Sequence, residues 1–185
     1  MKHRQAEPLK GILAGALAGL VGGLVMNQFQ NLWTKLSKDP TRSEHAHPPR
    51  QHVAPHNLEG EKQSQKEEEP ATVKAADAIS REVFDHKLTD DERRIAGPVM
   101  HYAFAVNTGM VYGALAELAP AATVGFGLPF GAAVWAVADE AVVPALGLSK
   151  PPTAYPLSNH LYSLASHFVY GASTEATRRL TRRLL

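Results

Sequence analysis

The 185-residue chain contains no cysteine. This absence excludes a disulfide framework, a thiolate nucleophile and any zinc site that is built from thiolates. The chain also lacks the Gly-x-Ser-x-Gly, Walker, Rossmann and His-Glu-x-x-His patterns of several large enzyme classes. Its net charge of +1 gives no electrostatic reason to expect a nucleic-acid partner. We therefore expect neither an enzyme nor a nucleic-acid-binding protein.

Charged residues are scarce in four long segments, residues 11–33, 95–119, 121–148 and 157–177. A helix of about 20 apolar residues is long enough to cross the hydrocarbon core of a bilayer. The sequence therefore predicts an all-α, polytopic membrane protein with four transmembrane helices, an amphipathic helix and a long polar loop. The predicted units are a basic tail with the first membrane helix (1–33), the loop with the amphipathic helix (34–94) and a three-helix membrane bundle with a basic C-terminus (95–185).

The first apolar segment follows a basic start, a combination that is also typical of a signal peptide. The run ends in polar residues and Trp33 rather than in a small-residue cleavage site, so we interpret it as an uncleaved anchor. Glycines recur on one arc of this helix, and a similar spacing occurs in segment 95–119. Such spacing lets two membrane helices approach closely. The predicted helix-packing positions are Gly11, Gly15, Gly19, Gly22, Gly109 and Gly113.

The polar segment between the first two spans contains a group of histidines. Imidazoles that are clustered in this way can bind zinc, copper or nickel, but a solvated linker is the alternative, since no rigid turn fixes their geometry. These weak candidates for metal ligands are His45, His47, His52 and His56. Residues 71–88 then predict an amphipathic helix on the membrane surface or against the bundle. Thr89 and Glu92 fit a capping box, so the next helix should begin near Asp90.

Asp139 and Glu140 lie side by side in the apolar segment 121–148. A carboxylate in the middle of a membrane helix costs roughly 2.5–3.5 kcal/mol on insertion scales, so it is rare and usually faces protein or water. Counting along antiparallel helices places both carboxylates in the same half of the membrane as histidines of two other spans. The predicted polar cluster consists of His101, Asp139, Glu140, His160 and His167. In the alternative, only residues 121–138 are in the bilayer, and both carboxylates lie in water at its surface.

The opposite half of the membrane is predicted to contain an ion pair. Glu175 stands three and four residues before Arg178 and Arg179, a spacing that favours pairing on a helix. Further arginines toward the C-terminus indicate a headgroup interface. Four spans place both termini on one side, and the distribution of Lys and Arg in the short segments favours the cytoplasm.

Several of these residues carry a resemblance to a known family. The order in question is His101, Tyr112, Ala116-Glu117, Pro120, Pro144-x-x-Gly147-Leu148, Pro152, His167, Glu175 and Arg178-Arg179. It resembles the YagU-like family, bacterial inner-membrane proteins of poorly defined function that are linked by name to acid resistance. The resemblance covers roughly residues 96–179 and implies a location in the bacterial inner (cytoplasmic) membrane. The polar loop and the Asp139-Glu140 pair depart from the family pattern, and the resemblance implies no catalytic residues.

Two classes of function follow. In the first, the polar cluster binds a proton or a metal ion and senses or relays acid, because histidine titrates nearest to physiological pH. Haem is a minor alternative, and a metal ion is the only other cofactor that the residues suggest. In the second, the chain is an accessory or scaffold subunit whose glycine faces dock onto larger membrane proteins or onto another copy. In both, its surroundings are the lipid bilayer.

Overall fold

The computed structural model describes residues 6–37 and 69–185, so His45, His47, His52 and His56 lie outside the described residues. Within the described ranges, 84% of the residues are helical and no strand occurs, which confirms the all-α prediction. The longer helices are α1 (Pro8–Ser37), α2 (Ala71–Phe84), α3 (Asp90–Leu118) and α6 (Leu157–Leu184). Between α3 and α6 lie α4 (Leu128–Val134), the π-helical segment η3 (Trp135–Val142) and α5 (Val143–Ala145), with the short 3₁₀ turns η2 (Pro120–Thr123) and η4 (Pro152–Ala154) on either side.

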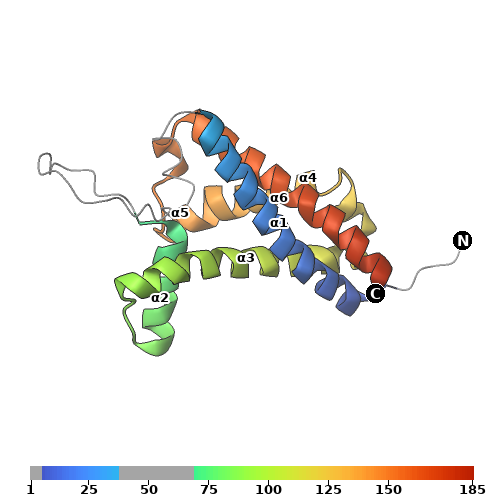
Figure 1. The fold of residues 1–185 in the computed structure, drawn as a ribbon, viewed down its shortest axis with the longest axis horizontal. Helices are drawn as coiled ribbons and strands as arrows, with labels where there is room; N and C mark the ends of the chain where they lie inside the picture. Colours follow the sequence, from blue (N-terminus) through green and yellow to red (C-terminus); the bar gives the residue numbers. More distant parts are fainter. Residues whose placement is uncertain (1–5, 38–68) are drawn as a thin grey trace, which may run out of the picture.

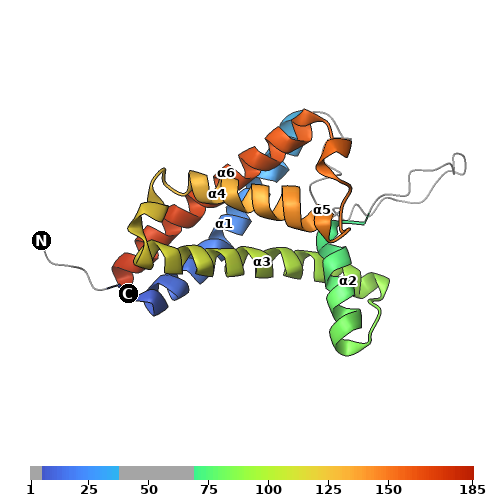
Figure 2. The same ribbon diagram turned by 180° about the vertical axis from the view of Figure 1, so that it is seen from behind.

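The helices alternate in direction and form one bundle. In Figure 1, α1 and α6 run side by side, α3 crosses α1, and α2 lies across the beginning of α3. Seen from behind in Figure 2, α4, η3 and α5 form one continuous rod that packs on α6. The start of α1 and the end of α6 lie together at what we call the terminal end. The end of α1 and the beginnings of α3 and α6 lie at the opposite end, which we call the loop end.

Glycines set the closest approach between helices at two crossings. A methyl group on Gly15 would overlap the backbone oxygen of Gly109, and one on Gly109 would overlap Gly15 in return. The predicted positions Gly11, Gly19 and Gly113 belong to this α1–α3 crossing, and Gly22 faces α6. A second crossing, which was not predicted, joins α4 to α6 through Gly131 and Gly171. Backbone contact of this kind requires glycine, because any side chain would force the helices apart.

The third predicted helix begins later than expected, at Leu128 rather than near residue 121. The reason is the turn at Gly125, Phe126 and Gly127, in which all three residues have positive φ angles of 54–80° and cannot continue a right-handed helix. From Leu128 the rod continues through Asp139 and Glu140 to Ala145. Both carboxylates therefore lie inside a continuous helical segment rather than at its end.

The junction between α2 and α3 agrees with the sequence pattern. Thr89 caps α3, its hydroxyl accepting from the Glu92 amide while the Glu92 carboxylate accepts from the Thr89 amide, so the predicted capping box is confirmed. On α2, Val73 is buried against Gly97 of α3. Val83 and Phe84, near the end of α2, are exposed. α2 packs mainly against α3, and its far end extends past the bundle.

Two helices, Pro8–Leu36 and Leu128–Ala145, are long and apolar enough to cross a membrane. α3 and α6 are also long enough, but they are not apolar enough by the same measure, because polar side chains interrupt them. Length and composition therefore support two of the four predicted crossings.

Candidate functional site

The predicted polar cluster lies between α3, η3 and α6. On α6, His160, Ser163 and His167 recur at a spacing of three and four residues, which places them on one face of the helix. This face meets Asp139 and Glu140 of η3. In a π-helix the hydrogen bonds run from residue i to i+5, so each turn is wider and neighbouring side chains diverge less than in an α-helix. The two adjacent carboxylates can therefore both reach α6.

His160 has a hydrogen-bond partner at each ring nitrogen. Its Nε2 lies 3.1 Å from the backbone oxygen of Pro152, and because a carbonyl oxygen only accepts, Nε2 must carry a hydrogen. Its Nδ1 lies 2.7 Å from Glu140 Oε1. A contact this short needs a hydrogen between the two atoms, carried either by Nδ1 of an imidazolium or by the carboxyl group of Glu140. The His160–Glu140 pair therefore holds one proton more than a neutral histidine beside a carboxylate.

Asp139 links the other members of the cluster. The Ser163 hydroxyl donates to Asp139 Oδ2 over 2.7 Å, and His167 Nδ1 lies 3.8 Å from the same oxygen. His167 Nδ1 is 2.9 Å from the backbone oxygen of Ser163, so this nitrogen carries a hydrogen. His101 of α3 interacts electrostatically with both His167 and Asp139. Its Nε2 is buried and has no hydrogen-bond partner in the described part of the chain.

The geometry of the cluster does not match that of a metal site. Among the described residues, no three His, Asp or Glu side chains are placed to hold one metal ion. One ring nitrogen, His160 Nδ1, instead lies 2.7 Å from a carboxylate oxygen, Glu140 Oε1, with a hydrogen between them. A pair of this kind can gain and lose a proton.

A second polar group, which we call the Glu175 network, lies at the terminal end. Glu175 is 0% exposed, and its carboxylate accepts from Arg178 Nε over 2.7 Å and from Arg179 Nε over 2.5 Å. The Tyr112 hydroxyl of α3 donates to the same carboxylate over 2.9 Å. The Arg179 guanidinium also lies 4.8 Å from the ring centre of Phe126. One buried negative charge is therefore matched by permanent positive charges and a neutral donor.

Arg182 of α6, beside this network, links α6 to α3 and to the residue before α1. Its Nε donates to Glu117 of α3 over 2.7 Å, and its NH2 group donates to Glu7, just before α1, over the same distance. Lys10 and then Arg182 lower the pKa of Glu7. Arg178 and Arg182 are buried, and Glu175 and Glu117 of the chain itself neutralise them.

Comparison with known proteins places the chain in a family. A family model described as "Protein of unknown function (DUF1440)" matches residues 41–176, which is most of the chain. The chain belongs to the DUF1440 family. Neither the search of curated proteins nor the search of solved structures returned a match.

In this DUF1440 member, the sequence pattern missed several residues that shape the two polar groups. Ser163 is one, although its position three residues after His160 and four before His167 places it on the same face. The Pro152 carbonyl, which sets the tautomer of His160, leaves no signal in a sequence. Gly131 and Gly171 hold α4 against α6, and their pairing across 40 positions could be found only in three dimensions.

Proposed function

We propose that this DUF1440 member is a multi-pass protein of the bacterial inner membrane, YagU-like in type, with both termini in the cytoplasm. The four crossings are α1, α3, the rod from α4 to α5, and α6. Two of these helices are apolar enough to cross a membrane by themselves. Because the four elements alternate in direction, α3 and α6 would cross beside them, with His101 of α3 and His160 and His167 of α6 turned toward the bundle.

We infer that the polar cluster binds and releases a proton in response to acid, and that this is a non-enzymatic sensing role. The observation that carries this proposal is the 2.7 Å contact between His160 Nδ1 and Glu140 Oε1, with Pro152 fixing a hydrogen on Nε2. If the shared proton leaves, two hydrogen-bond acceptors face each other at that distance. They must then separate, which loosens η3 from α6. An ordinary histidine pKa is about 6.5, so acid stress lies within reach of this switch.

A proton fits the cluster better than a metal ion does. The described residues provide no three converging ligands, whereas His160 and His167 each have a hydrogen-bond partner at Nδ1. With the termini in the cytoplasm, the loop end lies at the outer side of the membrane. The cluster would then respond to the pH outside the cytoplasm.

The test uses Trp135, which lies in η3 one turn before Asp139, as a local probe. The chain has two tryptophans, so Trp33→Phe leaves Trp135 as the only one. We expect the fluorescence of this variant in lipid nanodiscs to change in a single step between pH 8 and pH 4. His160→Gln and Glu140→Gln should each remove that step. His86→Gln is the matched control, because His86 also pairs with a glutamate, Glu92, but outside the bundle. A step that survives both cluster variants would refute the proposal.

A second candidate function is an accessory subunit of a larger membrane complex. It is favoured by the candidate span Leu128–Ala145, of which only 11% is buried within the chain. A large partner could cover the remainder. Extraction in mild detergent tests this role: copurification with a larger complex at fixed stoichiometry would support it, and a free monomer or homodimer would argue against it.

A further inference from the structure

One exposed face of α3 has the spacing of a helix–helix seam. Its positions follow each other at alternating steps of three and four residues, the repeat by which two helices pack along their length. These positions are Met100, Phe104, Asn107, Val111, Ala114 and Leu118. Phe104, Val111 and Leu118 are 48%, 59% and 64% exposed. The glycine face of α3 that packs on α1 lies on the opposite side of the helix. The rod of α4 and η3 lies on one side of the seam, across a hollow, and leaves Phe104 and Val111 exposed.

Asn107 is the only polar residue in this seam, and it lies near its centre. Its Nδ2 donates to the backbone oxygen of Ala103 over 2.8 Å, which uses one of its two N–H groups. The other N–H and the amide oxygen remain at an exposed surface. In a bilayer, lipid tails cannot satisfy these groups, so the amide needs a protein partner. An amide that offers one donor and one acceptor is complementary to an identical amide.

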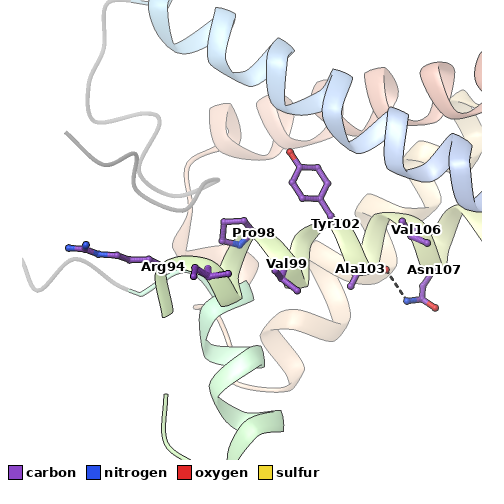
Figure 3. Close-up of a pocket in the computed structure, with 8 residues that line it drawn as sticks. Arg94, Pro98, Val99, Tyr102, Ala103, Val106 and Asn107 are labelled. Atoms are coloured by element: carbon purple, nitrogen blue, oxygen red, sulfur yellow. Dashed lines mark hydrogen bonds between the residues drawn. The ribbon is translucent and has the colours of Figure 1, made fainter. Parts of the chain in front are cut away.

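Open hollows on both sides of Asn107 leave room for such a partner. One, of about 740 Å³, follows the first half of α3, from Arg94 to Asn107. The other, of about 310 Å³, lies between α3 and the rod of α4 and η3 and also includes Asn107. Figure 3 shows Tyr102 pointing toward α1, while Asn107 lies on the side of α3 that faces away from α1. The amide therefore stands on a ridge between two apolar hollows.

We propose that this seam is the interface with a second copy of the chain, in which the two Asn107 amides pair across a two-fold axis. A two-fold axis brings the same patch of each copy together, so a single central amide meets its own counterpart. One buried Asn in an otherwise apolar seam fixes the register and the number of helices. The seam is separate from the polar cluster, but the argument rests on the proposed membrane location, since in water an exposed Asn needs no partner.

Cysteine cross-linking in native membranes tests the interface, and the absence of native cysteines makes every single-cysteine variant unambiguous. Phe104→Cys, Val111→Cys and Leu118→Cys should form disulfide-linked dimers under a mild oxidant, because facing seam positions bring their Cα atoms within about 7 Å. Leu17→Cys is the matched control, an apolar α1 residue with the same exposed fraction as Phe104. It should give no dimer. Equal cross-linking at Leu17→Cys would show random collision and overturn the proposal, as would no cross-linking in the seam.

The role of Asn107 is tested separately by dimer fraction in nanodiscs of fixed lipid composition. Asn107→Leu should weaken dimerisation by about 3- to 20-fold, the range expected for interhelical hydrogen bonds in membranes. Asn107→Gln should restore most of it, because the amide is kept. Unchanged dimerisation in Asn107→Leu would overturn amide pairing. Recovery of the native chain from the soluble fraction would refute the membrane proposal itself, whereas membrane-bound monomers would refute only the dimer.

Discussion

The Glu175 network and the polar cluster each hold a glutamate carboxylate against basic side chains of α6, but the basic side chains are of different types. Glu175 is held by two arginines, whose charge does not change in the physiological pH range. Glu140 is held by His160, whose charge depends on pH. The terminal end is therefore built to stay ionised, and the loop end is built to change.

The carboxylates of the two groups also differ in how deeply they are buried. Glu175 is fully enclosed, whereas the Asp139 side chain is 39% exposed and the Glu140 side chain 22%. A fully buried carboxylate destabilises the fold unless positively charged partners stay bound to it. The carboxylates of η3, which the proposed function requires to exchange a proton, are less enclosed than Glu175. The proposed pH response therefore belongs to the loop end, whereas the Glu175 network is expected to stabilise the fold.

The largest effect is expected from removing Glu175. Glu175→Ala leaves the buried Arg178 without its counter-charge, and breaking a buried pair in this way costs about 3–5 kcal/mol. The thermal unfolding temperature in detergent should fall steeply. The double variant Glu175→Leu with Arg178→Leu should recover much of the loss, because no unpaired charge remains.

The matched change at the loop end is Glu140→Ala. His160 can become neutral when its partner is removed, and it is partly exposed, so this variant should lose far less stability than Glu175→Ala while it loses the pH response. Equal losses of stability in the two variants would contradict the division between the two ends.

The residues that could be predicted are those whose partners are close in sequence. Glu175 with Arg178 and Arg179, and Thr89 with Glu92, follow from local helix geometry. The membership of the polar cluster followed from counting depth along helices of opposite direction. The π-helical turn that aims both Asp139 and Glu140 at α6, and the late start of α4, depend on backbone geometry that no residue spacing reveals. The glycines were recognised as packing positions, but which glycine meets which depends on the tertiary arrangement.

Single hydrogen bonds to the two carboxylates should differ in strength. Tyr112→Phe removes a donor to the enclosed Glu175 but keeps the ring stacked on Phe130, with 4.2 Å between ring centres. A hydrogen bond to a buried charge contributes about 1.5–3 kcal/mol. Ser163→Ala removes a donor to the partly solvated Asp139, where about 0.5–1.5 kcal/mol is expected. Denaturant titration of both variants measures the difference, and a larger loss for Ser163→Ala would reverse the comparison.

The two glycine crossings allow each end to be disturbed separately. A side chain at Gly131 would overlap the backbone oxygen of His167 and push η3 away from α6. Gly131→Val should therefore cost about 1–3 kcal/mol and also abolish the fluorescence step of Trp135. Gly15→Val disturbs the α1–α3 crossing at a similar cost but should leave that step in place. Loss of the step in both variants would show that the cluster depends on the whole bundle.

The smallest effect is expected at the third His–carboxylate pair, His86 with Glu92, which lies outside the bundle. The Thr89 amide, followed by His86 and the Thr89 hydroxyl, lowers the pKa of Glu92 from its ordinary value of 4.5 to about 2. A lowered carboxylate pKa stabilises the fold above the ordinary value, and this contribution is lost as the pH falls through about 2. The α2–α3 junction should therefore not respond between pH 8 and pH 5, where the polar cluster does. An NMR titration of the Glu92 carboxyl should give a midpoint near 2, and His86→Gln should raise it toward 4.5. A junction that loosens near pH 6 would mean that any His–Glu pair in this chain acts as a switch, and the distinction made for His160 and Glu140 would fail.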